Sequence, residues 1–411
     1  MDPKQNLVAL VVTLSACAVS ADDSDTSIFT LSSFGTAGIV HSSEKKADFA
    51  SGTFKPNGAG HSRSWSADVD SLIGAQMTAN FTPQLSSVVQ VISEQRYDNS
   101  YRPFFEWANI KYQLTPDFNA RVGRVVLPTF LLSDTRKVGY TMPWVRPPQE
   151  VYSLIPISSS DGMDVSYRFH INDITNTVQA NYGQNDSRLP GDAGKAMARE
   201  LWGVTNTTEF GTLTTRISYM KADLTVEQFN SLFDKFREFG AQGNAIADRY
   251  DSDGTAIEFF GVGASYDPGE WFVMSEWGRI ASHSTLGRRS AWYVSGGYRI
   301  EAFTPYITYA REKSEFDTST PGLTVSALPP ALTQAAVGLN GILNSILGQN
   351  EGQQTLSLGV RWDFTRNMDV KLQYDHTRLK GSATGPLINT QPDFEPGGSF
   401  NLISLAVDFV F

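Results

Sequence analysis

Apolar and polar side chains alternate along much of this chain with a period of two, the spacing that places them on opposite faces of a β-strand. In the longest run, Trp65–Phe81, Ile73 and Met77 share one face while Gln76 and Thr78 share the other. Shorter runs of the same kind occupy 177–182, 355–364 and 403–411. Strands of soluble proteins usually extend over about five or six residues, whereas a tilted membrane strand needs about ten. The long alternation therefore predicts membrane-spanning strands that extend beyond the bilayer.

The connections between these strands alternate between short and long. Very short turns are expected at 82–84, 115–117, 172–173, 210–211, 267–269, 301–302 and 365–367. Longer segments are expected at 43–62, 98–103, 128–160, 185–198, 224–253, 283–288, 314–352 and 381–399. Seven short turns and eight long loops join sixteen strands and leave both termini on the short-turn side. This asymmetry is typical of an outer-membrane barrel, so we predict an all-β fold: a transmembrane, antiparallel β-barrel of sixteen strands.

One stretch, Arg124–Asp164, follows neither a strand period nor a helix period. Its prolines, among them Pro128, Pro147 and Pro148, prevent a long helix or a paired strand from running through it. It is nevertheless too rich in aromatic and aliphatic residues for a disordered linker. We expect this third long loop, residues 128–160, to be packed against another part of the protein.

The amino terminus has the pattern of an export signal. Lys4 precedes an apolar run, and small residues lead to Ala21, which predicts a signal peptide over 1–21 and a mature barrel over 22–411. The alternative, lipid attachment at Cys17, stays open. Cys17 is the only cysteine, so a mature chain cleaved after Ala21 has no disulfide, no thiol nucleophile and no thiolate metal site. A formal net charge of −10 disfavours nucleic acid as a partner, and nothing in the sequence predicts a cofactor.

With these features the chain resembles the trimeric porins of the Gram-negative outer membrane. The resemblance rests on the strand count, the position of the long irregular loop and the aromatic carboxyl-terminal residue Phe411. It implies a homotrimer in the cell outer membrane, in contact with lipid and lipopolysaccharide. It also implies insertion assisted by Phe411, a third loop folded into the barrel, and passive diffusion of small hydrophilic solutes and ions.

A pore of this kind works through its diameter and its electric field. The charged residues expected at the constriction are Arg121, Arg124, Asp134, Arg136, Lys137, Arg146, Glu150, Asp164 and Arg168. Bases outnumber acids in the loop, whereas the general members of the family place acids there, so we expect the channel to favour anions. Arg124 is out of phase with Arg121, so a bulge or the strand end would have to redirect it. The alternatives are that individual charges are only solvated or paired, and that the constriction binds one class of solute, such as an organic anion.

Two long loops contain helical patterns, at 225–240 and 333–347. They are expected either to cover the pore mouth or to bury their apolar faces on each other. An enzyme is the competing class of function, but the five histidines are scattered one per segment and suggest no catalytic group. We therefore expect no catalytic residue and no metal site.

Overall fold

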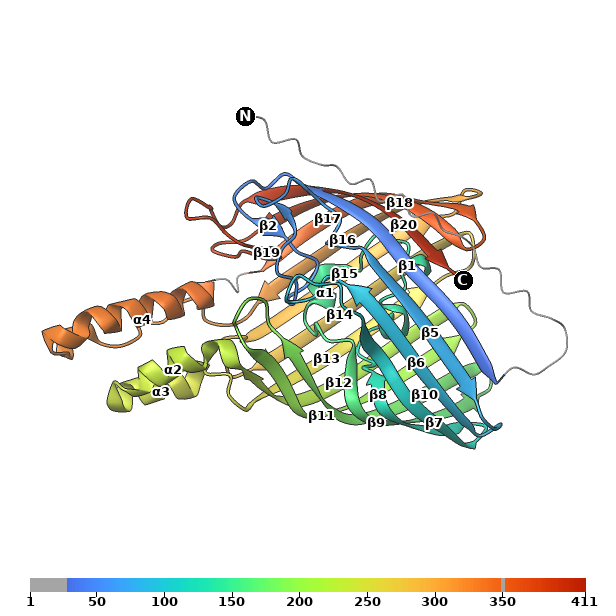
Figure 1. Ribbon diagram of the computed structural model, residues 1–411, viewed down its shortest axis with the longest axis horizontal. Coiled ribbons are helices and arrows are strands. Elements are labelled where there is room, and N and C mark those ends of the chain that lie inside the picture. The colour runs from blue at the N-terminus through green and yellow to red at the C-terminus, as the bar shows by residue number, and fades with distance from the viewer. Residues whose placement is uncertain (1–27, 349–351) are drawn as a thin grey trace.

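The computed structural model describes residues 28–348 and 352–411, in which sixteen long antiparallel strands close into a tilted barrel (Figure 1). The strands are β1 (Phe29–Ser42), β5 (Leu72–Asn80), β6 (Leu85–Glu94), β7 (Phe104–Thr115), β8 (Phe118–Val126), β9 (Ser159–Ile171), β10 (Ile174–Arg188), β11 (Lys195–Phe210), β12 (Leu213–Val226), β13 (Thr255–Tyr266), β14 (Trp271–Ser282), β15 (Arg288–Tyr298), β16 (Phe303–Ser314), β17 (Gln353–Thr365), β18 (Met368–Leu379) and β20 (Ser399–Val410). The last strand pairs with the first, so that Val410 lies opposite Phe34. The predicted strand number and the alternation of short and long connections are confirmed. The signal-peptide and lipidation predictions lie outside the described residues.

The remaining elements lie in the long connections. They are the short strands β2 (Asp48–Phe49), β3 (Ala59–Gly60), β4 (Trp65–Ser66) and β19 (Leu387–Ile388), the 3-10 turns η1 (Ser133–Thr135), η2 (Gly139–Thr141), η3 (Glu227–Phe229) and η4 (Val325–Ala327), and the helices α1 (Gln149–Tyr152), α2 (Asn230–Arg237), α3 (Gly240–Tyr250) and α4 (Pro330–Gly348). Strands β2, β3 and β19 form a small sheet that ties the first long loop to the last. The first loop is thereby held over the long-loop end of the barrel.

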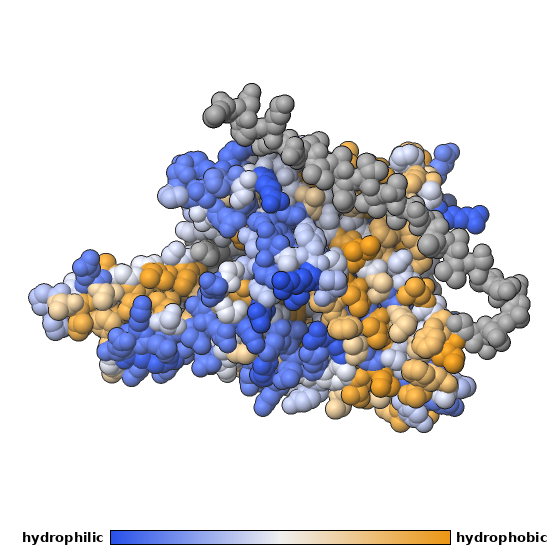
Figure 2. Space-filling view, in the orientation of Figure 1, coloured by the Kyte–Doolittle hydropathy of each residue, from blue (hydrophilic) through white to orange (hydrophobic). Residues whose placement is uncertain are grey.

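The barrel has apolar side chains outside and polar side chains inside, the reverse of a soluble protein. Large apolar residues such as Ile217, Val262 and Leu358 are exposed, while polar residues of the opposite strand faces, such as Thr308 and Asp375, are buried. Figure 2 shows the hydrophobic residues gathered over the half of the barrel away from α2, α3 and α4. In the described part of the chain, no helix is both long and apolar enough to cross a bilayer.

Aromatic residues border this apolar surface at both ends, as expected at the two membrane interfaces. Toward the long loops the ring is formed by Trp202, Tyr219, Phe260, Trp277, Trp292 and Tyr309, most of which touch a neighbouring ring. Toward the short turns it includes Tyr112, Tyr167, Phe210, Tyr266, Trp271, Tyr298, Phe303 and Trp362. The apolar surface between the two rings is therefore the membrane-facing part of the barrel.

The sequence pattern predicted a single strand over Trp65–Phe81, and this prediction is wrong. Strand β4 ends at Ser66, and β5 begins only at Leu72. Between them, the hydroxyl of Ser71 exchanges hydrogen bonds with the backbone N–H and C=O of Gly38, at 3.0 and 3.1 Å. A side chain here replaces the backbone pairing that would have continued the strand.

The loops at 225–240 and 333–347 do form helices, with different boundaries. Strand β12 runs to Val226, and Thr225 accepts a hydrogen bond from Gly254 rather than capping a helix. Gly240 does not end the helical region, because its positive φ of +67° joins α2 to a further helix, α3. Leucines of α4 share one buried cluster with phenylalanines of α2. Of the two alternatives from the sequence, a cover over the pore mouth and burial of the apolar helix faces on each other, this contact is the second. Figure 1 shows the three helices extending away from the barrel.

Candidate functional site

The third long connection, residues 127–158, contacts the buried faces of strands far from the two that it joins. It links β8 to β9, yet the indole N–H of Trp144 donates to Ser295 Oγ at 2.8 Å and Thr308 Oγ1 at 2.9 Å, on β15 and β16. The Tyr152 hydroxyl donates to Glu276 on β14 at 2.7 Å. Because these wall residues lie on the polar, buried strand faces, the loop is fixed against the inner wall.

Arg146 connects the loop to the wall next to the first strands of the barrel. Its guanidinium contacts Asp70 at 2.6 Å and Asp375 at 3.0 Å, and all three side chains are buried. The same group lies 5.2 Å from the ring centre of Phe49 in the first long loop. Two carboxylates beside it raise the pKa of Arg146, although burial alone would lower it. Arg146 therefore acts as a permanently charged anchor rather than as a free charge.

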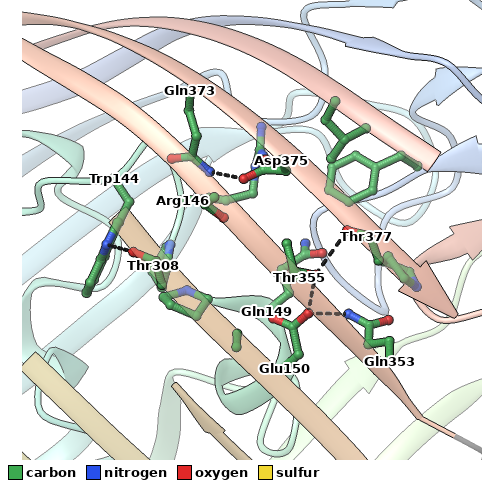
Figure 3. Close-up of a pocket in the computed structure, with 17 residues that line it drawn as sticks. Trp144, Arg146, Gln149, Glu150, Thr308, Gln353, Thr355, Gln373, Asp375 and Thr377 are labelled. Carbon is green, nitrogen blue, oxygen red and sulfur yellow. Dashed lines mark hydrogen bonds and ion pairs between the residues drawn. The ribbon is translucent and has the colours of Figure 1, made fainter. Parts of the chain in front are cut away.

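Glu150, in α1, is anchored without any basic partner. Its carboxylate accepts hydrogen bonds from Gln353 Nε2, at 2.8 Å, and from the Thr355 hydroxyl, both on β17 (Figure 3). Burial raises the pKa of Glu150 despite these two donors, since desolvation disfavours the ionised form. The loop thus holds a buried acid and a buried base on the same stretch of wall.

The middle of the loop is bound through its backbone. Lys371 Nζ, which is fully buried on β18, donates to the carbonyl oxygen of Gly139 at 2.7 Å. Arg361 donates to the carbonyl oxygens of Tyr140 and Met142. These donors satisfy carbonyl groups for which a proline-rich loop offers few partners of its own.

The surface of the loop away from this wall borders a cavity of about 510 Å³. The opposite side of the cavity is formed by β6, β7, the adjoining ends of β10 and β11, and the loops at 43–64 and 95–103. Its lining includes eight bases, Lys55, Arg96, Arg124, Arg136, Lys137, Arg146, Arg188 and Lys195, and four acids, Asp70, Glu94, Glu106 and Asp186. The cavity is therefore basic in a chain that is acidic as a whole.

Most charges of this cavity are paired, but three bases contact no carboxylate. Glu94 is held by Lys137 at 2.6 Å and by Lys55 at 3.5 Å. By contrast, Arg136 donates to the backbone carbonyls of Tyr152 and Ile155, at 2.9 and 3.0 Å.

Arg96 and Arg188 are the other two of these bases, and both guanidinium groups lie near the Tyr97 ring, 5.7 and 5.5 Å from its centre. Within the described part of the chain, Glu106 is the one acid lining the cavity that has no bonded partner, so the uncompensated charge of the cavity is positive.

Four of the predicted constriction residues, Arg124, Arg136, Lys137 and Arg146, border this cavity, and the other five do not. Arg121 forms a bidentate pair with Asp164, with Nη2 and Oδ2 2.6 Å apart. Asp134 is mostly exposed and lies 3.7 Å from Arg216, while Glu150 is buried in the wall contact described above. Arg168 is exposed farther toward the short turns, where its backbone N–H donates to Asp117.

Arg124 lies on the opposite face of β8 from Arg121. The pairing of β8 with β9 runs without a shift from Arg121 to Arg124, so no bulge redirects the side chain. Arg124 instead pairs with Asp161 at 2.6 Å near the strand end, where both residues are partly exposed.

Sequence reasoning missed the wall opposite the loop, namely Lys55, Glu94, Arg96, Tyr97 and Arg188. The available signal was indirect: all lie in or beside long connections that neighbour the third loop in strand order. Which of these connections turns inward is decided by contacts between distant segments.

Among the described residues, no group of three or more His, Cys, Asp or Glu side chains could hold a metal ion.

Comparison with known proteins identifies the architecture. No protein-family model matches the chain, and no curated protein does. Among solved structures, the outer-membrane channel DcaP of Acinetobacter baumannii matches 94% of this chain and 99% of its own, with 10% identity and a TM-score of 0.55. The fold is that of an outer-membrane porin.

Two further porin-fold structures agree with this assignment. An anion-selective porin from Comamonas acidovorans matches 93% of this chain and 99% of its own, with 10% identity and a TM-score of 0.52. OmpT of Vibrio cholerae matches 94% and 99%, with 12% identity and a TM-score of 0.52. The porin fold and the membrane-facing surface together place the barrel in an outer membrane.

Proposed function

We propose that this porin-fold barrel is a passive diffusion channel for small hydrophilic solutes and ions, with a preference for anions. The observation that carries the proposal is the cavity between the third loop and the opposite wall. Its uncompensated bases, Arg96, Arg136 and Arg188, raise the local concentration of anions.

The third loop narrows the barrel in this proposal. A barrel of sixteen strands encloses a wide aqueous channel unless something fills it. The contacts of Trp144, Arg146 and Tyr152 hold the loop on one wall and leave the cavity on the other side. Replacing residues 132–153 by a short glycine-serine linker is expected to raise the single-channel conductance several-fold.

The deciding measurement is planar-bilayer recording of the purified barrel. In a gradient of potassium chloride, we expect a reversal potential of the sign that indicates greater chloride permeability. A reversal potential that favours potassium would overturn the anion preference, and the absence of conductance would overturn the channel itself.

A second candidate is a channel with a solute-binding constriction. It is favoured by the contacts of Arg96 and Arg188 with Tyr97, which place two cations and an aromatic ring within one cavity. An organic anion with an aromatic part would use all three groups. Current that saturates with, or is blocked by, one such anion supports this reading, whereas current linear in salt supports general diffusion.

We further propose that the protein is a homotrimer in contact with lipopolysaccharide and that it is not an enzyme. One of the similar solved structures is described as a trimer form.

The His41 side chain lies beside Ser64, but its Nδ1 lies 2.7 Å from the carbonyl oxygen of Ser64. Because Nδ1 then carries the hydrogen, it has no lone pair with which to activate the hydroxyl. Native molecular mass after mild solubilisation tests the trimer.

A further inference from the structure

The first long connection, like the third, turns toward the inside of the barrel. Phe49 belongs to one buried cluster with Leu379 of β18 and Leu402 of β20. Its ring centre lies 6.2 Å from that of Phe400, also on β20. Because these wall residues lie on the buried faces of their strands, the connection packs against the inner wall at the long-loop end.

A hairpin presents the innermost part of this connection. In it, β2 pairs with β3, and Phe49 lies opposite Ala59. Residues 50–58 join the two strands and are called here the first-loop tip. On its other side, β2 pairs with β19, where Phe49 lies opposite Leu387 of the last long loop (Figure 1). The tip approaches β2 so closely that a Cβ on Gly58 would lie 1.7 Å from the carbonyl oxygen of Phe49. A small folded unit therefore holds the tip in place.

The first-loop tip is also bonded to the third loop. The side-chain amide of Gln149, in α1, donates to the carbonyl oxygen of Ala50 at 3.3 Å. Lys55 pairs at 3.5 Å with Glu94, at the end of β6. The same carboxylate pairs with Lys137 of the third loop at 2.6 Å. Glu94 thus joins the two loops to one point of the wall.

Five consecutive residues of the tip, Ser51–Lys55, line the cavity of about 510 Å³ that carries the unpaired bases. The third loop lines the same cavity with Arg136 and Lys137, among others. Two loops that are far apart in the sequence therefore border one open space. A solute that passes through the cavity has to pass between them.

Gly52 shows how open this space is. Apart from Gly52 and its two chain neighbours, no heavy atom of the described residues lies within 4 Å of the position that its Cβ would take. Gly52 is also not among the described glycines with a positive φ, so a side chain is compatible with its backbone. Because Gly52 lines the cavity, a side chain added there would extend into the open space.

We propose that the first-loop tip is a second constricting element of the channel and that, together with the third loop, it sets the largest solute that can pass. This inference rests on the channel function proposed above and assigns part of the narrowing to a segment outside the third loop. A size limit of this kind acts on charged and uncharged hydrophilic solutes alike.

Gly52→Trp tests the proposal, because it adds a ring to the cavity without displacing a packed group. In planar-bilayer recordings of the full barrel, the single-channel conductance is expected to fall roughly twofold, since a narrower pore passes less current. Polyethylene glycols of increasing mass report the size limit: the smallest polymer that no longer lowers the conductance is the first one excluded. This polymer is expected to be smaller for Gly52→Trp than for the unaltered protein.

The matched control is Gly338→Trp, in α4. The space around its Cβ position is equally open, and Gly338 is not among the described residues that line the cavity. Conductance and size limit are expected to stay unchanged in this variant. Equal values for the two tryptophan variants would overturn the proposal. A lower conductance of Gly52→Trp with an unchanged size limit would overturn it as well, because the ring would then act on ions without narrowing the passage.

The opposite change replaces residues 50–58 by the dipeptide asparagine–glycine. Phe49 and Ala59 are directly paired, so a two-residue turn can join them and keep the hairpin. Removal of the tip is expected to raise the conductance roughly twofold and to raise the size limit. Unchanged values in a folded variant would contradict the proposal.

Folding of each variant is checked by the shift in gel mobility on heating. Should Gly52→Trp fail to fold, the replacement of residues 50–58 decides the matter, and the reverse also holds. Recordings of the unaltered protein separate this inference from the channel function itself. The absence of conductance there would overturn both, whereas normal conductance that responds to neither change at the tip would overturn only the role of the tip.

Discussion

At the scale of single residues, the field of the pore depends on which charges lack partners rather than on how many charges line it. Lys137 and Arg146 are positive, but Glu94 and Asp70 neutralise them at 2.6 Å. Arg136 is held by carbonyl oxygens and keeps its full charge toward the cavity. Selectivity is therefore expected to respond more strongly to Arg96, Arg136 and Arg188 than to the paired bases.

Reversing Arg188 tests this expectation. Arg188→Glu is expected to lower the chloride-to-potassium permeability ratio by roughly thirtyfold at low salt. A change of two charges at a distance on the order of 8 Å shifts the energy of each ion by about 1 kcal/mol, upward for chloride and downward for potassium. The matched control is Arg121→Gln, which alters a base already paired with Asp164 below the cavity. Equal effects of the two substitutions on the reversal potential would contradict the role assigned to unpaired bases.

Glu150 gives a prediction about pH. Burial raises the pKa of Glu150, so the folded protein favours the neutral form of this side chain. The stability that the neutral form contributes is fully present below the ordinary pKa of glutamate. It is lost as the pH rises through the raised pKa. Glu150→Gln keeps an oxygen that accepts from Gln353 and Thr355 without the charge. The melting temperature of the unaltered protein should therefore fall relative to that of Glu150→Gln as the pH rises above about 4 and through the raised pKa of Glu150.

The control for this comparison is Glu238→Gln, at an exposed position beyond α2. Its melting temperature should follow that of the unaltered protein at every pH. Parallel curves for all three proteins would show that Glu150 does not titrate differently in the folded state.

At the scale of elements, the third loop is positioned by buried anchors rather than by secondary structure of its own. Trp144 is the largest of them: it is 1% exposed, it donates two hydrogen bonds to the wall, and it packs edge-on against Tyr293 with ring centres 5.6 Å apart. Its truncation should release the loop while leaving the barrel strands intact.

Trp144→Ala is expected to cost about 3–5 kcal/mol of local stability. The measurement is hydrogen exchange of peptides from 139–152, which should lose protection while peptides from the strands keep theirs. Larger fluctuations of the open-channel current should accompany the change. Trp65→Ala, at a tryptophan that is 51% exposed, is the control and should leave both unchanged.

The elements also show what the sequence could and could not predict. Period-two alternation in four runs, together with the positions of the turns, predicted the sixteen strands, because each strand has one face toward lipid and one toward the interior. The break at Ser71 and the helix α3 were not predictable in this way. The first depends on a side chain bonded to a neighbouring strand, and the second has too few apolar residues for a clear helical period.

The same reasoning explains the outcome for the site. The sequence predicted Arg121 and Asp164 among the charges of the constriction, and in the structure they form an ion pair with each other. The partners of the loop residues could not be predicted, since Arg146 and Asp375 are 229 positions apart and nothing local relates them. Partner identity is a property of the closed barrel, not of any one segment.

At the scale of the whole molecule, closure depends on the two ends of the chain. The backbone N–H of Ser33 donates to the carbonyl of Phe411, and that of Phe411 donates to the carbonyl of Ser33, each at 2.8 Å. Deletion of Phe411 removes both bonds and should cost about 2 kcal/mol, which is about thirtyfold in the closure equilibrium. Phe411→Ala keeps the backbone pair and should cost less.

The measurement is the fraction of heat-modifiable, folded barrel after refolding into micelles. If the alanine variant is as defective as the deletion, the side chain rather than the backbone pairing completes the barrel. If neither variant is defective, closure does not depend on this residue.

The pairing of the first strand with the last has a consequence for how the protein is made. Strand β20 is made long after β1, and β1 has no permanent neighbour on that side until β20 arrives. An unpaired strand edge invites aggregation. The barrel can therefore complete its fold only after β20 has been made, and until then the free edge of β1 has to be kept from pairing with other chains.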